Sequence, residues 1–193
     1  MMKAIFITGQ SNRRCCQLSP KQKKIADFLE EEGVSVAPFN FPYDSQMNVY
    51  HETNLLNASL SNTLQYFLSR KPHFEKQYRA QVIKQFEQYG YCIVMAGSCG
   101  LELLNNLHLP VKLLKNMHVI AYGPVARTLP KTQVTMIQGR NDWLSKLFFK
   151  EVDYLVDCGH MDYLESTEIL NVLQQVICSI KKNQMNNIHE KCT

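Results

Sequence analysis

The chain has 193 residues, long enough for one domain with a substantial core, and its 45% hydrophobic and 20% charged residues are ordinary for a soluble globular protein. The formal net charge of +4 is too small, and the lysines and arginines are too dispersed, for a nucleic-acid-binding protein. No apolar run approaches the roughly 20 residues of a membrane span or suits a signal peptide, and the seven cysteines lack metal-type Cys-x-x-Cys spacing, so we expect a cytoplasmic protein without a metal site.

Two strands and one helix are predicted at the start of the chain. Apolar residues at 4–8 and 34–39 predict the strands. Between them, Ser19 is a good N-cap and Pro20 suits the first helical position, so a helix begins there and ends at Gly33. Strands that are apolar almost throughout, with a helix between them, indicate a parallel sheet covered on both faces.

The segment from Phe41 to Arg79 departs from this alternation. Apolar residues at helical spacing predict an amphipathic helix over 56–68, and a second helix over 79–89 follows the break at Pro72. The second helix is enough to connect adjacent strands, so the first is surplus. It is a candidate cap over one edge of the sheet, within a possible insertion spanning about 44–75, although simple packing on one face explains it equally well.

The second half of the chain continues the alternation of strands and helices. Further strands are expected at four places: from Tyr91, and over 117–122, 133–137 and 153–157. No helix fits between the 117–122 and 133–137 strands. Other helices are expected after the Tyr91 strand and over 143–150 and 162–182, which gives a single domain over 1–182 and a polar C-terminal tail over 183–193.

The stretch 91–104 carries the strongest local signal. Its apolar strand ends in four small residues, and helix-forming residues follow without a gap. This pattern predicts a sharp strand-to-helix turn with Ser98 at its apex, in a strained backbone conformation that projects the side chain outward. The residues two positions before and two positions after Ser98 must be small, and Ala96 and Gly100 meet this requirement. A turn with Cys99 at its apex and an ordinary close-packed turn remain alternatives.

Three polar residues each follow the carboxyl end of a predicted strand: Ser98, Asp142 and His160. In a parallel sheet these ends share one edge, where ligands bind. A serine hydroxyl needs an imidazole to take its proton, and a buried carboxylate must hold that imidazole in the correct tautomer. Asp157 and Asp162 also lie near His160 in the sequence and are alternatives for the carboxylate.

The turn at 96–100, Ala-Gly-Ser-Cys-Gly, and the chain order serine, aspartate, histidine resemble the α/β-hydrolase superfamily, whose usual turn is Gly-x-Ser-x-Gly. The resemblance runs from Met2 to about Lys182 and lacks the family's first two antiparallel strands. It implies an α/β three-layer sandwich with a mostly parallel six-stranded sheet in the order 2-1-3-4-5-6, and no cofactor. Ser98 would be the nucleophile, with His160 as its base and Asp142 as the carboxylate.

Two backbone N–H groups are expected to stabilise the oxyanion. One is that of Cys99, directly after the nucleophile, and the resemblance implies that Gln10, in the loop after the first strand, supplies the other. If the helix over 56–68 is a cap, its apolar face, with Leu60 and Leu64, is expected to lie above the serine and suit an acyl chain.

The expected function is that of a serine hydrolase cleaving a carboxylic ester or thioester of a small molecule through an acyl-enzyme. A non-catalytic hydrolase-fold protein that binds a small molecule or a partner, and an acyltransferase using the same triad, are the alternatives. The sequence lacks Gly-x-Gly-x-x-Gly and Walker-type phosphate loops, which counts against nucleotide binding. A flavodoxin-like binding protein would show the same alternation of elements but would not need these three residues at the strand ends.

Overall fold

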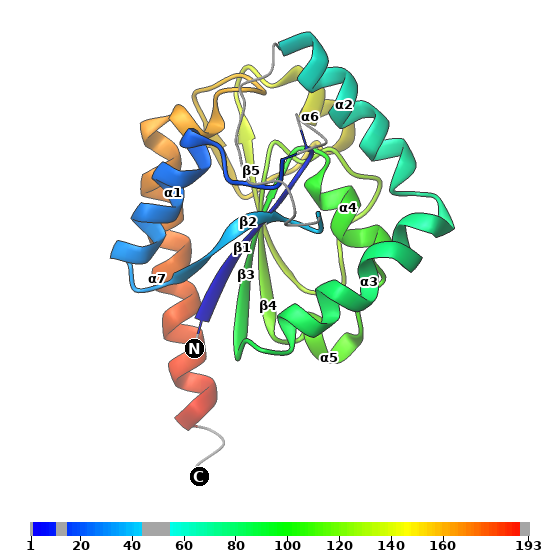
Figure 1. Cartoon of the computed structure of the whole chain (residues 1–193). Coiled ribbons are helices and arrows are strands. Elements are labelled where there is room, and N and C mark those ends of the chain that lie inside the picture. Colours follow the sequence, from blue (N-terminus) through cyan, green and yellow to red (C-terminus); the bar gives the residue numbers. More distant parts are fainter. Residues whose placement is uncertain (1, 11–14, 44–54, 190–193) are drawn as a thin grey trace.

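In the computed structural model, which describes residues 2–10, 15–43 and 55–189, six strands form one parallel sheet (Figure 1). The strands are β1 (Met2–Thr8), β2 (Ser35–Phe41), β3 (Tyr91–Gly97), β4 (Met117–Tyr122), β5 (Gln133–Gly139) and β6 (Tyr154–Val156). Their order is β2-β1-β3-β4-β5-β6, and every neighbouring pair is parallel. This confirms the predicted sheet and its strand order.

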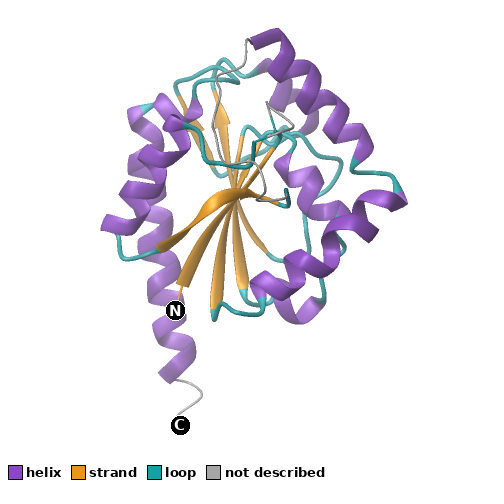
Figure 2. Cartoon of the chain, viewed as in Figure 1, coloured by secondary structure: helices purple, strands orange, loops and turns teal. Residues whose placement is uncertain are grey.

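Helices cover both faces of the sheet, so the molecule has three layers (Figure 2). The helices are α1 (Pro20–Glu31), α2 (Leu55–Leu68), α3 (Pro72–Phe86), α4 (Gly100–Asn106), α5 (Val111–Leu114), α6 (Trp143–Phe148) and α7 (Thr167–His189). In Figure 1, α1 and α7 lie on one face, and α3, α4 and α5 lie on the other. Within the described ranges, none of these helices is both long and apolar enough to cross a membrane.

The alternation of side chains along the strands divides the core between the two faces. Ala4 and Phe6 of β1 belong to the cluster beneath α1 and α7, whereas Ile5 and Ile7 belong to the cluster on the other face. All seven residues of β3 are buried because β3 lies between β1 and β4 and is covered on both sides. That double burial explains why its sequence is apolar throughout rather than alternating.

Local sequence signals account for where the helices begin. Ser19 and Gln22 form a capping box at the start of α1, as each side chain bonds the other residue's backbone N–H. The predicted start of the second helix is wrong, because α3 begins at Pro72 rather than at residue 79. Proline lacks the N–H that would be unpaired at the first helical position, so it starts this helix as well as ending the preceding pattern.

The C-terminal helix also differs from its prediction. A 3₁₀ turn, η1 (Tyr163–Glu165), comes first, and α7 then continues to His189. Residues 183–189, predicted as part of the polar tail, therefore belong to the helix, and the Gln184 side chain hydrogen-bonds Tyr91 at the start of β3. The beginning of the predicted cap insertion, at 44–54, lies outside the described residues.

Candidate active site

The turn after β3 has the conformation that its sequence predicts. Ser98 has a φ of 51°, in the left-handed region that residues other than glycine rarely occupy, whereas Cys99 has a helical φ of −65°. The apex is therefore Ser98, which excludes the turn with Cys99 at its apex. Burial also raises the pKa of the Cys99 thiol to about 12, so this thiol stays protonated at neutral pH.

The small residues around Ser98 allow β1, β3 and α4 to approach one another closely. A Cβ atom on Gly100 would lie 1.8 Å from the backbone oxygen of Ile7, and one on Gly97 would lie 2.5 Å from the Tyr122 ring. Ala96 is fully buried in β3. The packing at this turn thus excludes larger side chains at these positions.

The structure brings the three predicted site residues together at the carboxyl edge of the sheet. Ser98 Oγ lies 2.9 Å from His160 Nε2, and His160 Nδ1 lies 2.8 Å from Asp142 Oδ2. With the imidazole proton on Nδ1 and donated to Asp142, Nε2 is free to accept the hydrogen of the Ser98 hydroxyl. This is the arrangement required for a serine activated by histidine.

Asp142 is completely buried, with 0% of its surface exposed, and it caps α6. Its Oδ1 accepts the Ser145 backbone N–H at 2.9 Å, and its Oδ2 accepts the Tyr163 hydroxyl at 2.6 Å as well as His160. Burial alone would raise the pKa of Asp142, but the hydrogen bonds from His160, Ser145 and Tyr163 outweigh it and lower that pKa. Asp142 therefore remains ionised beside His160.

Neither of the two alternative carboxylates forms a hydrogen bond or an ion pair with His160. Asp157 and Asp162 are both exposed. The Asp157 carboxylate accepts a hydrogen bond from Asn141 at 3.4 Å, and the Asp162 carboxylate lies beside Gly159. Of the three candidates in the sequence, the structure places Asp142 at the imidazole.

The two expected oxyanion donors differ in their surroundings. The Cys99 backbone N–H lies at the N-terminal end of α4, directly after Ser98. The Gln10 N–H instead donates to Gln65 Oε1 at 2.7 Å, and Gln65 Nε2 donates back to the Gln10 carbonyl at 2.7 Å. Ser61 Oγ donates to the same carbonyl at 2.7 Å. The Gln10 N–H is thus already used by a side chain of α2.

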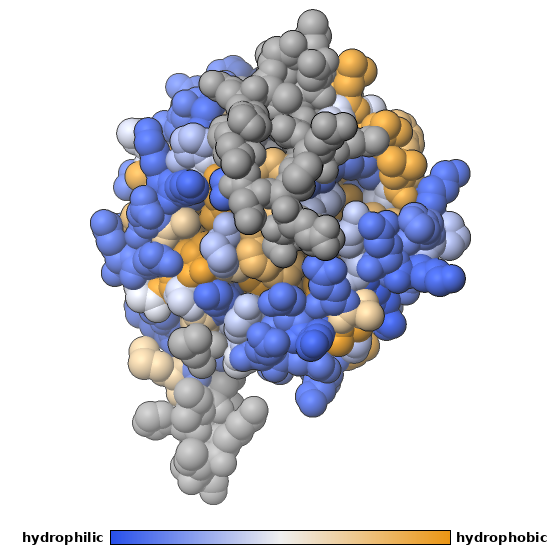
Figure 3. All heavy atoms as spheres, viewed as in Figure 1, coloured by the Kyte–Doolittle hydropathy of each residue, from blue (hydrophilic) through white to orange (hydrophobic). Residues whose placement is uncertain are grey.

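The orientation of α2 contradicts the expectation of an apolar lining above the serine. Leu60 and Leu64 are 70% and 45% exposed, while the polar side chains of Ser61 and Gln65 face the loop after β1. Figure 3 shows apolar side chains along the outer side of α2. The physical reason is that the loop presents backbone N–H and C=O groups that must be hydrogen-bonded, and polar side chains satisfy them.

No protein-family model matches the sequence, and no curated protein is significantly similar to it. A solved structure, however, shares its architecture. A protein from Xanthomonas campestris pv. campestris, assigned as a hydrolase of the alpha/beta superfamily, superposes with a TM-score of 0.55 over 92% of this chain and 97% of its own, at 11% identity. This chain has the α/β-hydrolase fold.

Two further structures give lower scores. An a/b serine hydrolase without a lid, from Xanthomonas campestris, has a TM-score of 0.49 at 15% identity and covers 91% of this chain and 78% of its own. An alpha-beta serine hydrolase homologue from Coxiella burnetii has a TM-score of 0.46 at 12% identity and covers 92% of this chain and 83% of its own.

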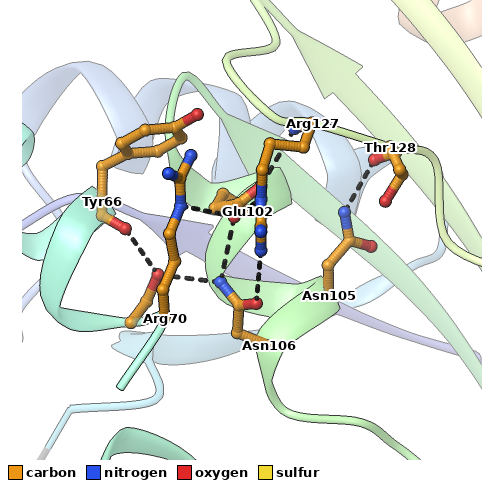
Figure 4. Close-up of polar contacts among 8 residues, drawn as sticks. Tyr66, Arg70, Glu102, Asn105, Asn106, Arg127 and Thr128 are labelled. Atoms are coloured by element: carbon orange, nitrogen blue, oxygen red, sulfur yellow. Dashed lines mark hydrogen bonds and ion pairs between the residues drawn. The ribbon is translucent and has the colours of Figure 1, made fainter.

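An ionic cluster around the buried Glu102, which the sequence analysis missed, anchors the end of α2 to α4 (Figure 4). Glu102 is 1% exposed, and its Oε1 accepts Arg70 Nε at 3.0 Å and Arg127 Nε at 2.8 Å. Its Oε2 accepts the Arg127 backbone N–H at 3.0 Å, and Arg70 stacks on the Tyr66 ring at 4.1 Å. The end of α2 and the loop after β4 are thereby tied to the helix that follows Ser98.

Replacing Glu102 by glutamine is expected to lower the free energy of unfolding by about 1–3 kcal/mol at neutral pH, because a buried carboxylate with several charged donors is lost. Burial raises the pKa of Glu102, but hydrogen bonds from Arg127 and Asn106 lower it overall. A carboxylate with a lowered pKa stabilises the fold above its ordinary pKa and loses that effect as the pH falls. The difference between variant and parent should therefore shrink in acid.

Urea denaturation at several pH values measures this difference. Glu75→Gln is the matched control, because Glu75 forms an exposed ion pair with Arg79 and an exposed hydrogen bond with His108, and such exposed interactions contribute little. A Glu102→Gln variant that is no less stable than Glu75→Gln at neutral pH would contradict an anchoring role for the cluster.

Proposed function

We propose that the protein is a serine hydrolase that cleaves a carboxylic ester or thioester of a small molecule through an acyl-enzyme. The observation that carries this proposal is the chain of contacts from Ser98 Oγ to His160 Nε2 at 2.9 Å and from His160 Nδ1 to the buried Asp142 at 2.8 Å. The strained φ of Ser98 supports it, because strain is stored where function requires it. The α/β-hydrolase fold is compatible with this activity but does not by itself specify it.

In this proposal, Ser98 Oγ attacks the carbonyl carbon of the substrate as its proton passes to His160 Nε2. The negative charge formed on the substrate oxygen is stabilised by the Cys99 N–H at the N-terminal end of α4. The tetrahedral intermediate formed by this attack then breaks down: the bond to the leaving alcohol or thiol breaks, and the leaving group takes the proton from Nε2. A water molecule then attacks the acyl carbon, gives its proton to Nε2, and the bond to Oγ breaks as Ser98 regains its proton.

The acyl-enzyme leaves the identity of the acceptor open. An alcohol or amine in place of water would make the protein an acyltransferase. A small-molecule acyl substrate and a cytoplasmic location belong to the same proposal, and the cysteine usage of the sequence supports that location.

A non-catalytic binding protein is the second candidate, and one observation favours it. The Gln10 N–H, expected as the second oxyanion donor, is held by Gln65. Gln10 can act as that donor only after Gln65 has released it. Loss of one oxyanion donor costs about 10²–10³-fold in turnover in other hydrolases, so a permanently held Gln10 would leave a weak enzyme or none.

A fluorophosphonate probe tests the proposal, since it reacts with a serine that has an activating base. We expect the probe to label the intact protein on Ser98, located by mass spectrometry, and Ser98→Ala to abolish labelling. Labelling on Cys99, or no labelling of correctly folded protein, would favour a cysteine nucleophile or the binding protein instead. Comparing product release in water with that in added alcohol separates hydrolysis from acyl transfer.

A further inference from the structure

The proposed reaction gives no role to the Tyr163 hydroxyl, although it lies against the carboxylate of the triad. Tyr163 opens η1, three residues after His160, and is 3% exposed. Its hydroxyl oxygen accepts the Gly139 backbone N–H at 2.6 Å, so its own hydrogen is left to be donated to Asp142 Oδ2, also at 2.6 Å. The direction of the second bond is thus fixed by the first.

The surrounding backbone makes room for this side chain. A Cβ atom on Gly123, where φ is +56°, would lie 2.6 Å from the Tyr163 ring and 3.1 Å from Asp142 Oδ2. The ring also meets the His160 ring edge-on, with 6.5 Å between centroids. The loops after β4 and β6 and the end of β5 therefore hold Tyr163 and the triad in one packed unit.

We propose that Tyr163 is a positioning residue of the triad, whose hydroxyl holds Asp142 Oδ2 toward His160 and draws off part of the negative charge of that oxygen. This inference rests on the proposed hydrolase function. A carboxylate that receives fewer hydrogen bonds is a stronger acceptor. Without the Tyr163 donor, Asp142 would bind the His160 imidazolium more tightly, and His160 would keep its proton to a higher pH.

The other ionisable groups near this unit leave Tyr163 as the group that acts on Asp142. Those in its vicinity are Cys158, Asp157, Asp162 and Glu168, and the exposed pair of Lys21 with Glu165 at 2.7 Å. Burial raises the pKa of Cys158 to about 11, and burial also raises the pKa of Tyr163, so both are uncharged at neutral pH. Among the described residues, none of these neighbouring groups other than Tyr163 donates a hydrogen bond to Asp142.

Tyr163→Phe tests the inference, with Tyr122→Phe as its matched control. Both variants remove one hydroxyl from a buried tyrosine, and the two rings are 6.0 Å apart. The Tyr122 hydroxyl has no hydrogen-bond partner among the described residues, whereas that of Tyr163 has two. The pair therefore separates the loss of the two hydrogen bonds of Tyr163 from the loss of a hydroxyl group in the same part of the core. Of these two bonds, only the one to Asp142 reaches the carboxylate beside His160, so the titration of His160 reports on it.

For Tyr163→Phe we expect the acid limb of the kcat/KM–pH profile to move up by about 0.5–1 pH unit, and kcat at the optimum to fall roughly tenfold with little change in KM. For Tyr122→Phe we expect the profile of the parent. A merely structural role of Tyr163 would lower the folded fraction without moving the acid limb. Identical profiles for the two variants would overturn the inference.

A readout that needs no activity separates this inference from the proposed function. The ¹⁵N NMR titration of His160 in the whole protein should show the same upward shift in Tyr163→Phe and none in Tyr122→Phe. If the parent hydrolyses no ester but the shift is present, the hydrolase proposal fails and the positioning role stands. Should Tyr163→Phe not fold, difluorotyrosine at position 163, a stronger donor, should move the titration of His160 to lower pH, and an unmoved titration overturns the inference.

Discussion

Replacing Asp142 by asparagine is expected to lower kcat for ester hydrolysis by about 10⁴-fold. The side-chain NH₂ of asparagine can donate to Nδ1 of His160, which favours the tautomer that carries its proton on Nε2. Nε2 would then have no lone pair to accept the proton of Ser98. In the parent protein, Nε2 lies 2.9 Å from Ser98 Oγ. The size and shape of the side chain change little, so the loss of turnover should far exceed any loss of folded fraction.

Asp157→Asn and Asp162→Asn provide the comparison, since both carboxylates are exposed. Both variants should keep turnover within a few-fold of the parent, measured on the same ester at equal folded fraction. If Asp142→Asn keeps near-normal turnover while one of the other two loses it, the wrong carboxylate has been assigned to His160.

The central part of the fold could be predicted because its signals are local. The apolar stretches predict the strands of the parallel sheet, and the resemblance to the α/β-hydrolase superfamily implies their order. The turn at Ser98 was recognisable because the backbones of β1 and α4 nearly touch, which only small residues at 96–100 allow. The placement of Ser98, Asp142 and His160 at one edge of the sheet follows from the strands that each of them terminates.

The remaining features depend on partners far apart in the sequence. Gln65 bonds Gln10 across 55 positions, and Tyr163 bonds Asp142 across 21. For α2, the apolar spacing predicts an inner face, but the polar residues between the apolar ones face the loop after β1 instead. Glu102 is an acidic residue within an otherwise apolar run of the sequence, and such a residue requires charged or hydrogen-bonding partners once it is buried.

The close contact between α4 and β1 leaves no room for a side chain at Gly100. Gly100→Ala is expected to lower the free energy of unfolding by about 3 kcal/mol or more. The new Cβ would lie 1.8 Å from the Ile7 backbone oxygen and 2.7 Å from its carbonyl carbon. Neither partner can yield cheaply, because β1 pairs with both β2 and β3 and α4 is held by Glu102. The strand and the helix would have to separate, and Ser98 would move with them.

Gly159→Ala serves as the control for this prediction. Its Cβ would lie 2.9 Å from the Asp162 carboxylate, the end of an exposed side chain that can rotate away, so we expect a change below about 1 kcal/mol. Urea denaturation of both variants measures the difference through the shift of the midpoint at constant slope. A Gly100→Ala variant as stable as Gly159→Ala would mean that α4 and β1 are further apart than the structure places them. It would also mean that the close packing around Ser98 does not constrain the turn.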